Sequence, residues 1–266
     1  MRLIHPQTIY NNLPPEDVFF ATDDVGTMHG LGYLVYQCQP SLYPDCPINL
    51  YFHLESQPAA RQMLMGALMA RARLIRDYDP TVRARVYTSV APGDSDSLAF
   101  YASNGLDLEE GEQRIWMSAL PGHPIMPMGC ALAETPLQTA VQQQEFIQRF
   151  QENDLTYINQ DILNQVQYLP HRLAVGLVRS NAVVGEALFG GQGNEAELYG
   201  IYIAYDQRHQ GLGNVLLRQA MGVLADEGVS RINASMLTRS TAQKKLFGAF
   251  SCQTAGVTAI YPGLYL

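Results

Sequence analysis

The sequence predicts two mixed α+β domains in tandem, each a mostly antiparallel, twisted sheet flanked by helices. Its 266 residues are 47% hydrophobic, which is enough for one large core or for two of ordinary size. The Pro- and Gly-rich stretch LPGHPIMPMG, residues 120–129, separates two halves of about one domain each. Both halves also end in the same order of strand, loop and short helix, which indicates a weak internal repeat.

In the second half, residues 128–266, apolar spacing predicts helices over 137–153 and 161–169. The runs RLAVGLV and VVGEALFGG, joined by the turn RSNA, predict an antiparallel hairpin. Alternation predicts a strand over 196–205, and an apolar face predicts a helix over 214–228 that ends at Gly228. The remaining elements are expected to be a strand over 231–237, a short helix over 241–250 and a strand over 256–261.

In the first half, residues 1–122, the same criteria predict a strand over 48–55, a helix over 60–78, a strand over 83–90, a helix over 97–105 and a strand over 113–120. The stretch VRARVYTSVAPGDSDSLAFYASNG aligns with SRINASMLTRSTAQKKLFGAFS of the second half. The front of the first half is shorter and has no counterpart of the two opening helices. We therefore expect the first domain to be a degenerate copy of the second.

Composition argues against several classes of protein. The net charge is −8, and residues 1–127 hold 8 basic and 14 acidic residues, against 9 and 11 in 128–266. An acidic first half argues against nucleic acid as partner, and it suits either a cationic substrate or a solvated acidic face. No apolar run approaches the ~18 residues of a spanning helix, and the N-terminus has no apolar signal stretch. We therefore expect a cytoplasmic protein without membrane contact.

The cysteines and histidines give no sign of a metal site. The four cysteines form no CxxC pair, and the six histidines show no pairing at metal-ligand spacing. We expect buried free thiols and no metal.

The stretch QRHQGLG, residues 207–213, places Arg208, Gly211 and Gly213 between a predicted strand and a predicted helix. The first N–H groups of a helix lack partners, and the helix dipole adds partial positive charge there. Glycines let a phosphate approach the backbone closely. The pattern is neither a Walker loop nor the three-glycine dinucleotide fingerprint. It predicts an anion cradle, and the alternative is an ordinary tight turn.

The strand over 196–205, the loop RHQGLG, the amphipathic helix and the short-helix run LFGAFSC together resemble the GCN5-related N-acetyltransferase (GNAT) superfamily. This resemblance covers residues 128–266. In the first half, FYASNG resembles the family's Phe/Leu-Tyr-x-x-x-Gly element. The whole chain then resembles a tandem of two such domains, as in mycothiol synthase-like proteins, with a degenerate domain over 1–122 and an acetyl-CoA-binding domain over 128–266.

The resemblance implies acetyl-CoA as co-substrate and assigns residues to it. The backbone of Ile201 and Ile203 would pair with the pantetheine arm, and Ser240 would also lie at the cofactor. The pyrophosphate loop and the helix start would comprise Arg208, His209, Gln210, Gly211, Leu212, Gly213 and Asn214.

Glu197 lies eleven residues before Arg208, where some family members have a general-base glutamate. An amine with a pKa near 10 must lose a proton before it attacks a thioester, so a base is chemically required. The alternative for Glu197 is an ordinary strand-end carboxylate.

The sequence departs from the family pattern in both halves. Phe247 stands where the family has the tyrosine that protonates the thiolate, and Ser251 replaces a glycine. Ser240, Thr241 or a water would then act as the acid, or the thiolate leaves unassisted.

Tyr101 occupies the acid position of the first half, where the loop reads SQPAARQ without glycines, so a packed core tyrosine is the alternative there. Lys244 and Lys245 either meet the 3′-phosphate of CoA or form a solvated pair.

The resulting hypothesis is an acetyl-CoA-dependent N-acyltransferase that moves an acetyl group to an amine of a small molecule or peptide by direct attack on the thioester. The alternative is a degenerate CoA-binding sensor or regulatory module without catalysis. A third possibility is a hydroxyl or thiol acceptor. We expect a monomer or homodimer, and the sequence does not name the acceptor.

Overall fold

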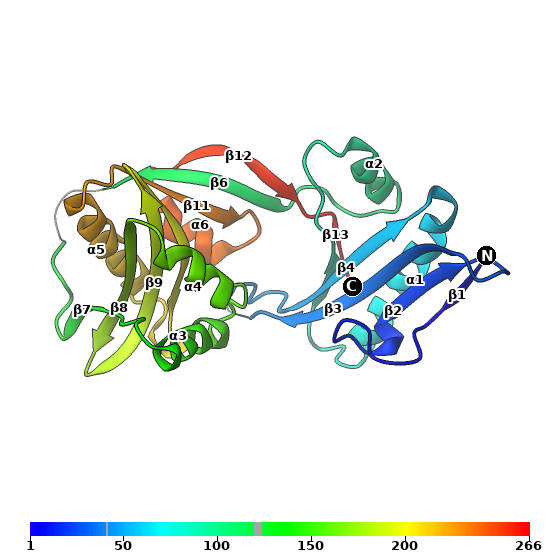
Figure 1. Cartoon of the computed structure of the whole chain (residues 1–266), viewed down its shortest axis with the longest axis horizontal. Coiled ribbons are helices and arrows are strands. Elements are labelled where there is room, and N and C mark those ends of the chain that lie inside the picture. Colours follow the sequence, from blue (N-terminus) through cyan, green and yellow to red (C-terminus); the bar gives the residue numbers. More distant parts are fainter. Residues whose placement is uncertain (41, 120–123) are drawn as a thin grey trace. The chain divides into compact units, whose positions relative to one another are not determined.

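The computed structural model describes residues 1–40, 42–119 and 124–266, which form two compact units (Figure 1). Unit 1 comprises Met1–Gly111 and Thr258–Leu266, and unit 2 comprises Glu112–Val257. The chain therefore enters unit 2 after Gly111 and returns to unit 1 at Thr258. Each unit combines a mostly antiparallel sheet with helices, which confirms the predicted mixed α+β class.

Unit 1 has two layers in its described residues. Its sheet has the strand order β1-β2-β3-β4-β5-β13. Helices α1 (Pro58–Asp77) and α2 (Ser95–Ser103) contribute to one apolar core with this sheet. The strands are β1 (Arg2–Ile4), β2 (Val18–Thr22), β3 (Met28–Cys38), β4 (Ile48–Ser56), β5 (Ala84–Tyr87) and β13 (Gly263–Tyr265).

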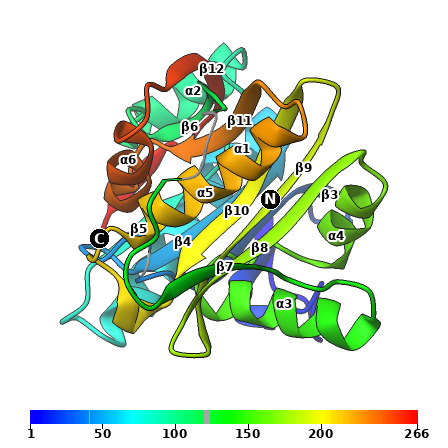
Figure 2. The same ribbon diagram turned by 90° about the vertical axis from the view of Figure 1, so that its left-hand side faces the viewer.

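Unit 2 has three layers. Its sheet has the order β12-β6-β11-β10-β9-β8-β7. Helix α5 (Leu212–Asp226) packs across β8, β9 and β10 on one face (Figure 2), and α6 (Thr241–Gly248) joins the same core. Helices α3 (Ala140–Glu152) and α4 (Gln160–Gln167) form a separate core on the other face. The strands are β6 (Gly111–Ser118), β7 (Cys130–Glu134), β8 (His171–Arg179), β9 (Ala182–Gln192), β10 (Glu195–Ile203), β11 (Arg231–Leu237) and β12 (Gln253–Ile260).

The two units share a parallel strand–helix–strand core. In unit 1, β4 and β5 pair in parallel on either side of α1 in the chain; in unit 2, β10 and β11 do so on either side of α5. A short helix follows the second strand of each pair, which matches the internal repeat predicted from the sequence. The two halves therefore repeat the same structural unit.

The two halves also exchange strands. The antiparallel neighbour of β11 is β6, which precedes the Pro- and Gly-rich linker (residues 120–129) in the chain, with pairs from Arg231↔Ser118 to Leu237↔Glu112. The antiparallel neighbour of β5 is β13, at the C-terminal end of the sequence, with pairs from Gly263↔Tyr87 to Tyr265↔Arg85. Each sheet thus contains a strand from the other half of the sequence.

The units have bounds that differ from the predicted division into 1–122 and 128–266. The predicted division lies at the Pro- and Gly-rich stretch 120–129, of which residues 120–123 lie outside the described residues. The predicted strand over 113–120 corresponds to β6, but its pairing with β11 places it in unit 2. Local periodicity identifies a strand and carries no information about which sheet it joins. The domain bounds of the sequence therefore stay a prediction.

No helix in the described part of the chain is long and apolar enough to cross a membrane. The same residues contain no group of three or more His, Cys, Asp or Glu side chains that is arranged to hold a metal ion.

The exchange of strands predicts how fragments behave. Ile115 and Met117 of β6 are 2% and 1% exposed within the core of unit 2. At about 1.5–3 kcal/mol for each buried side chain, their loss removes roughly 3–6 kcal/mol, a large part of a typical domain's stability. A fragment of residues 112–257 is expected to unfold cooperatively in urea, and the matched fragment 128–257 is expected not to. Equal urea midpoints, measured by circular dichroism, would contradict the exchange.

Candidate active site

The parallel strands β10 and β11 part in the middle of the unit 2 sheet. They pair over four positions, from Glu195↔Arg231 to Leu198↔Ala234, and then the pairing ends although both strands continue. At the same point the pairing of β10 with β9 shifts register between Leu198 and Gly200, as at a β-bulge. Among the described strands, the second half of β10 therefore has a neighbour on one edge only.

The unpaired edge of β10 carries the backbone groups of Ile201 and Ile203. The amide of Ala204 donates to the carbonyl of Val184 at 2.9 Å, so Ala204 faces β9. Because backbone groups alternate between the two edges of a strand, those of Ile201 and Ile203 face away from β9, toward β11. These are the two residues predicted to pair with the pantetheine arm.

The connection from β10 to α5 consists of the 3-10 turn η2 (Tyr205–Gln207) and a short loop with unusual backbone angles. His209 and Gly211 both have left-handed conformations, with φ of 63° and 76°. Gly211 is the N-cap of α5 and supplies no side-chain hydrogen bond to the helix. The first amides of α5 therefore have no acceptor from a capping side chain, which leaves them available to an anion.

The structure requires glycine at one of the two glycine positions of the loop and not at the other. The positive φ of Gly211 is a conformation that other residues adopt only with strain, so the turn itself requires glycine. Gly213 has no positive φ, and a Cβ there would meet Leu246 Cδ1 at 3.5 Å and Ile203 Cγ1 at 3.7 Å, ordinary van der Waals contacts. The packing of the protein does not explain why Gly213 is glycine.

Arg208 is bonded within the protein. Its Nε donates to the carbonyl oxygen of Ile203 at 2.8 Å, and its Nη2 donates to Oδ1 of Asn153 at 3.3 Å. Its guanidinium lies 5.3 Å from the centre of the Tyr205 ring, and burial lowers its pKa. Arg208 thus connects the loop to the end of β10 and to the end of α3. Its predicted contact with a pyrophosphate stays a prediction.

The remaining predicted cofactor residues lie at or near the start of α5. The side chain of Leu212 is buried in the core, so only its backbone faces the loop. Asn214 has a buried Oδ1 that finds no hydrogen-bond partner among the described residues. Ser240 is fully buried, and its Oγ accepts a hydrogen bond from the amide of Gln243 as the N-cap of α6. Lys244 and Lys245 are exposed on α6.

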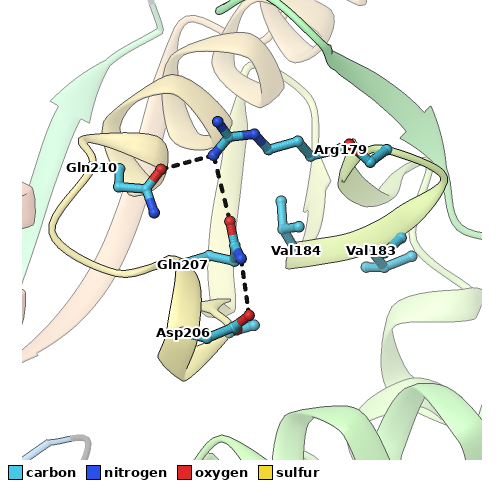
Figure 3. A pocket seen from close by; sticks show the side chains of 9 residues that line it. Arg179, Val183, Val184, Asp206, Gln207 and Gln210 are labelled. Carbon is cyan, nitrogen blue, oxygen red and sulfur yellow. Dashed lines mark hydrogen bonds between the residues drawn. The ribbon is translucent and has the colours of Figure 1, made fainter.

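The side chain of Gln210 belongs to a pocket of about 530 Å³ beside the loop (Figure 3). Arg179, at the end of β8, donates from Nη1 to Oε1 of Gln210 at 2.7 Å and to Oε1 of Gln207 at 3.5 Å. The β8–β9 hairpin therefore holds the loop on the side away from β11.

Ala196 and Leu198 point into the core under α5. Glu197, the predicted general base, lies between them in the strand and therefore on the opposite face of the sheet, the face that carries α3 and α4. Arg114 of β6 donates to both of its oxygens, from Nη1 to Oε1 at 2.9 Å and from Nη2 to Oε2. Burial raises the pKa of the Glu197 carboxyl, Arg114 lowers it, and Glu112 raises it. Arg114 could not be identified from local sequence signals, because its contact with Glu197 depends on the strand exchange.

Phe247 and Tyr101, which stand at the family's acid position in the two halves, are both core residues. The Phe247 side chain is 4% exposed and packs in the core under α5 and α6. Tyr101 is also 4% exposed and packs edge-on against Phe52, which confirms the reading of Tyr101 as a core tyrosine. In unit 1, Gln57 alone separates β4 from α1, which begins at Pro58, so no glycine loop precedes that helix.

Sequence reasoning missed a buried polar cluster around Glu186 of β9. This carboxylate is fully buried and accepts hydrogen bonds from Arg149 Nε at 2.7 Å, Arg149 Nη2 at 2.9 Å, the Tyr202 hydroxyl at 2.6 Å and the Thr135 hydroxyl at 3.1 Å. Its signal in the sequence is a single charge inside the apolar run VVGEALFGG. Burial raises the pKa of Tyr202, and the adjacent Glu186 adds to this, so the hydroxyl stays a proton donor to the carboxylate.

Comparison with known proteins agrees with this geometry. Residues 139–247 match the model of the Acetyltransferase (GNAT) family. No curated protein sequence matches the chain significantly.

The solved structures that are similar to this chain include the following two. A GCN5-related N-acetyltransferase from Sphaerobacter thermophilus shares 13% identity and a TM-score of 0.50, covering 96% of this chain and 82% of its own. Eis1 from Mycobacterium abscessus shares 12% identity and a TM-score of 0.53, covering 93% of this chain and 63% of its own. At these identities the similarity concerns the fold alone. Residues 139–247, which lie within unit 2 and include the parted strands and the loop before α5, therefore match a GNAT-type acetyltransferase domain.

Proposed function

We propose that unit 2 binds acetyl-CoA and transfers its acetyl group to an amine of a small molecule or peptide. The observation that carries this proposal is the uncapped N-terminus of α5, which follows the left-handed Gly211 and lies beside the unpaired edge of β10. A helix N-terminus of this kind suits a pyrophosphate, and an unpaired strand edge suits the amide groups of a pantetheine arm.

Two further features support acetyl-CoA as the ligand. Asn214, in the first turn of α5, has a buried Oδ1 that lacks a partner among the described residues and can accept a hydrogen bond from an N–H of the pantetheine arm. Gly213 leaves space between Ile203 and Leu246, next to the unpaired edge, which the fold does not require. Bound there, acetyl-CoA supplies an acetyl thioester, which is open to attack by an amine.

The residues of the chain have separate parts in this proposal. The amides of Ile201 and Ile203 bind and orient the arm, and the amides at the start of α5 hold the phosphates. Glu197, directly or through a water, accepts the proton that the amine must lose. Phe247 has no proton to give, so the thiolate takes its proton from water.

The second candidate function is a CoA-binding sensor without catalysis. It is favoured by the buried Phe247 and by the pairing of Glu197 with Arg114, since a paired carboxylate is less free to act as a base. A hydroxyl or thiol acceptor is a third outcome for an acceptor screen with thiol detection. A cytoplasmic location and a monomeric or homodimeric state belong to the same proposal.

Gly213 gives a direct test of cofactor binding. The change Gly213→Ala adds a methyl group in ordinary contact with the protein, so stability is expected to hold or to rise slightly. We expect acetyl-CoA affinity to fall by about tenfold or more, equivalent to ~1.4 kcal/mol, in calorimetric titration. The matched control is Gly66→Ala in α1, where nothing lies within 4 Å and affinity is expected to stay unchanged. Unchanged acetyl-CoA affinity in both variants would contradict the proposal that Gly213 lets the cofactor approach the backbone.

Substitutions at Arg114 and Glu197 test whether Glu197 acts as the general base. Because burial raises the pKa of Glu197, the acidic limb of the kcat/KM profile is expected above the pH of an ordinary glutamate. Arg114 favours the ionised form, so Arg114→Gln is expected to move this limb to higher pH. Glu197→Gln is expected to lower kcat by roughly 10²–10⁴. A pH profile that is identical in wild type and Arg114→Gln would contradict the role of Glu197.

The change Phe247→Tyr tests whether residue 247 lies at the position of a missing catalytic acid or is only a residue of the core. Because the ring is buried, the added hydroxyl is expected to lack a partner and to cost roughly 1–3 kcal/mol of unfolding free energy. We expect no gain in acetyl transfer. A clear rise in kcat would show that the ring reaches the reacting sulfur.

A further inference from the structure

The last turn of α3 carries two polar side chains that connect it to the candidate site. Arg149 and Asn153 are four residues apart, so they lie on the same face of the helix. Arg149 binds the buried Glu186. Asn153, the C-cap of α3, binds Arg208 of the loop before α5 (residues 208–211), called the cofactor loop below. From one face of α3, Arg149 therefore binds strand β9 and Asn153 binds the cofactor loop.

The first connection fixes α3 against β9 and β10. Arg149 donates two hydrogen bonds to Glu186, which also accepts one from Tyr202 of β10. A fully buried carboxylate with four donors is held in one position, because losing any donor leaves buried charge unsatisfied. The position of α3 relative to the unpaired part of β10 is set by this cluster.

The second connection leads from α3 to the loop. Oδ1 of Asn153 accepts from Nη2 of Arg208 at 3.3 Å, and Nε of the same guanidinium donates to the carbonyl of Ile203 at 2.8 Å. Nδ2 of Asn153 donates to the carbonyl of Arg149 at 2.9 Å. The two atoms of one amide thus have different partners: Nδ2 closes the helix end, and Oδ1 holds the loop.

We propose that Asn153 is a positioning residue for acetyl-CoA binding, which links the cofactor loop to α3 through Arg208. This inference rests on the proposed function. It adds that the loop takes up its binding conformation only while Arg208 is held between Ile203 and Asn153.

The alternative role for Asn153 is that of a helix cap alone, and two substitutions separate the roles. Asn153→Ala removes both the acceptor for Arg208 and the donor for Arg149. Asn153→Asp removes the donor and keeps an acceptor for Arg208. Gln148→Ala is the matched control, because Gln148 is an exposed residue of α3 whose side chain bonds Glu152.

The experiment is calorimetric titration of the full chain with acetyl-CoA, with thermal unfolding of each variant alongside. Asn153→Ala is expected to weaken acetyl-CoA binding by about tenfold, as for the loss of a hydrogen bond to a charged group. Asn153→Asp and Gln148→Ala are expected to bind within about twofold of wild type. Both changes at Asn153 are expected to lower the unfolding temperature, since both lose the cap.

Two results would overturn the link. Wild-type affinity in Asn153→Ala would show that Arg208 needs no anchor on α3. Equal weakening in Asn153→Ala and Asn153→Asp would show that the cap, and not the contact with Arg208, affects binding. A wild-type chain that binds no acetyl-CoA would instead refute the proposed function itself.

Discussion

The parting of β10 from β11 is the constraint on which the candidate site depends. Before the bulge, Ala196 and Leu198 face the core under α5; after it, a Cβ on Gly200 would meet Phe150 and Ile158, and Tyr202 packs with them, on the α3 side. One extra residue therefore reverses which face each side chain takes. It also ends the parallel pairing, so a strand edge inside the sheet stays open beside the N-terminus of α5.

The strand exchange makes this site depend on residues that precede the linker. Glu197 is held by Arg114 of β6, and β6 also covers the edge of β11 that faces away from β10. Within unit 1, Arg85 Nη2 binds Glu110 Oε2 and the carbonyl of Tyr261, both at 2.8 Å, close to the two points where the chain passes between units. The tandem arrangement thus supplies structural parts to both sheets.

Strong periodic segments were predictable, and long-range pairings were not. The strand over 196–205, the loop and the helix over 214–228 correspond to β10, the Arg208–Gly211 turn and α5, because apolar alternation, two glycines and an amphipathic face are local signals. Strands β1, β2, β3, β7 and β13 were missed, since their apolar residues alternate weakly or are few. The partners of Glu197, Glu186 and Arg208 come from distant elements, and a single sequence contains no signal for such contacts.

The most direct measurement of the central claim is an amide NMR titration of the isotope-labelled chain with acetyl-CoA. The account predicts the largest shifts at the amides of Gly211, Gly213 and Asn214 and at Ile201 and Ile203, because these groups are proposed to bind the phosphates and the arm. Saturable shifts confined to these positions and their neighbours would support acetyl-CoA binding at the uncapped helix. Unchanged amides there, with or without shifts elsewhere, would contradict it.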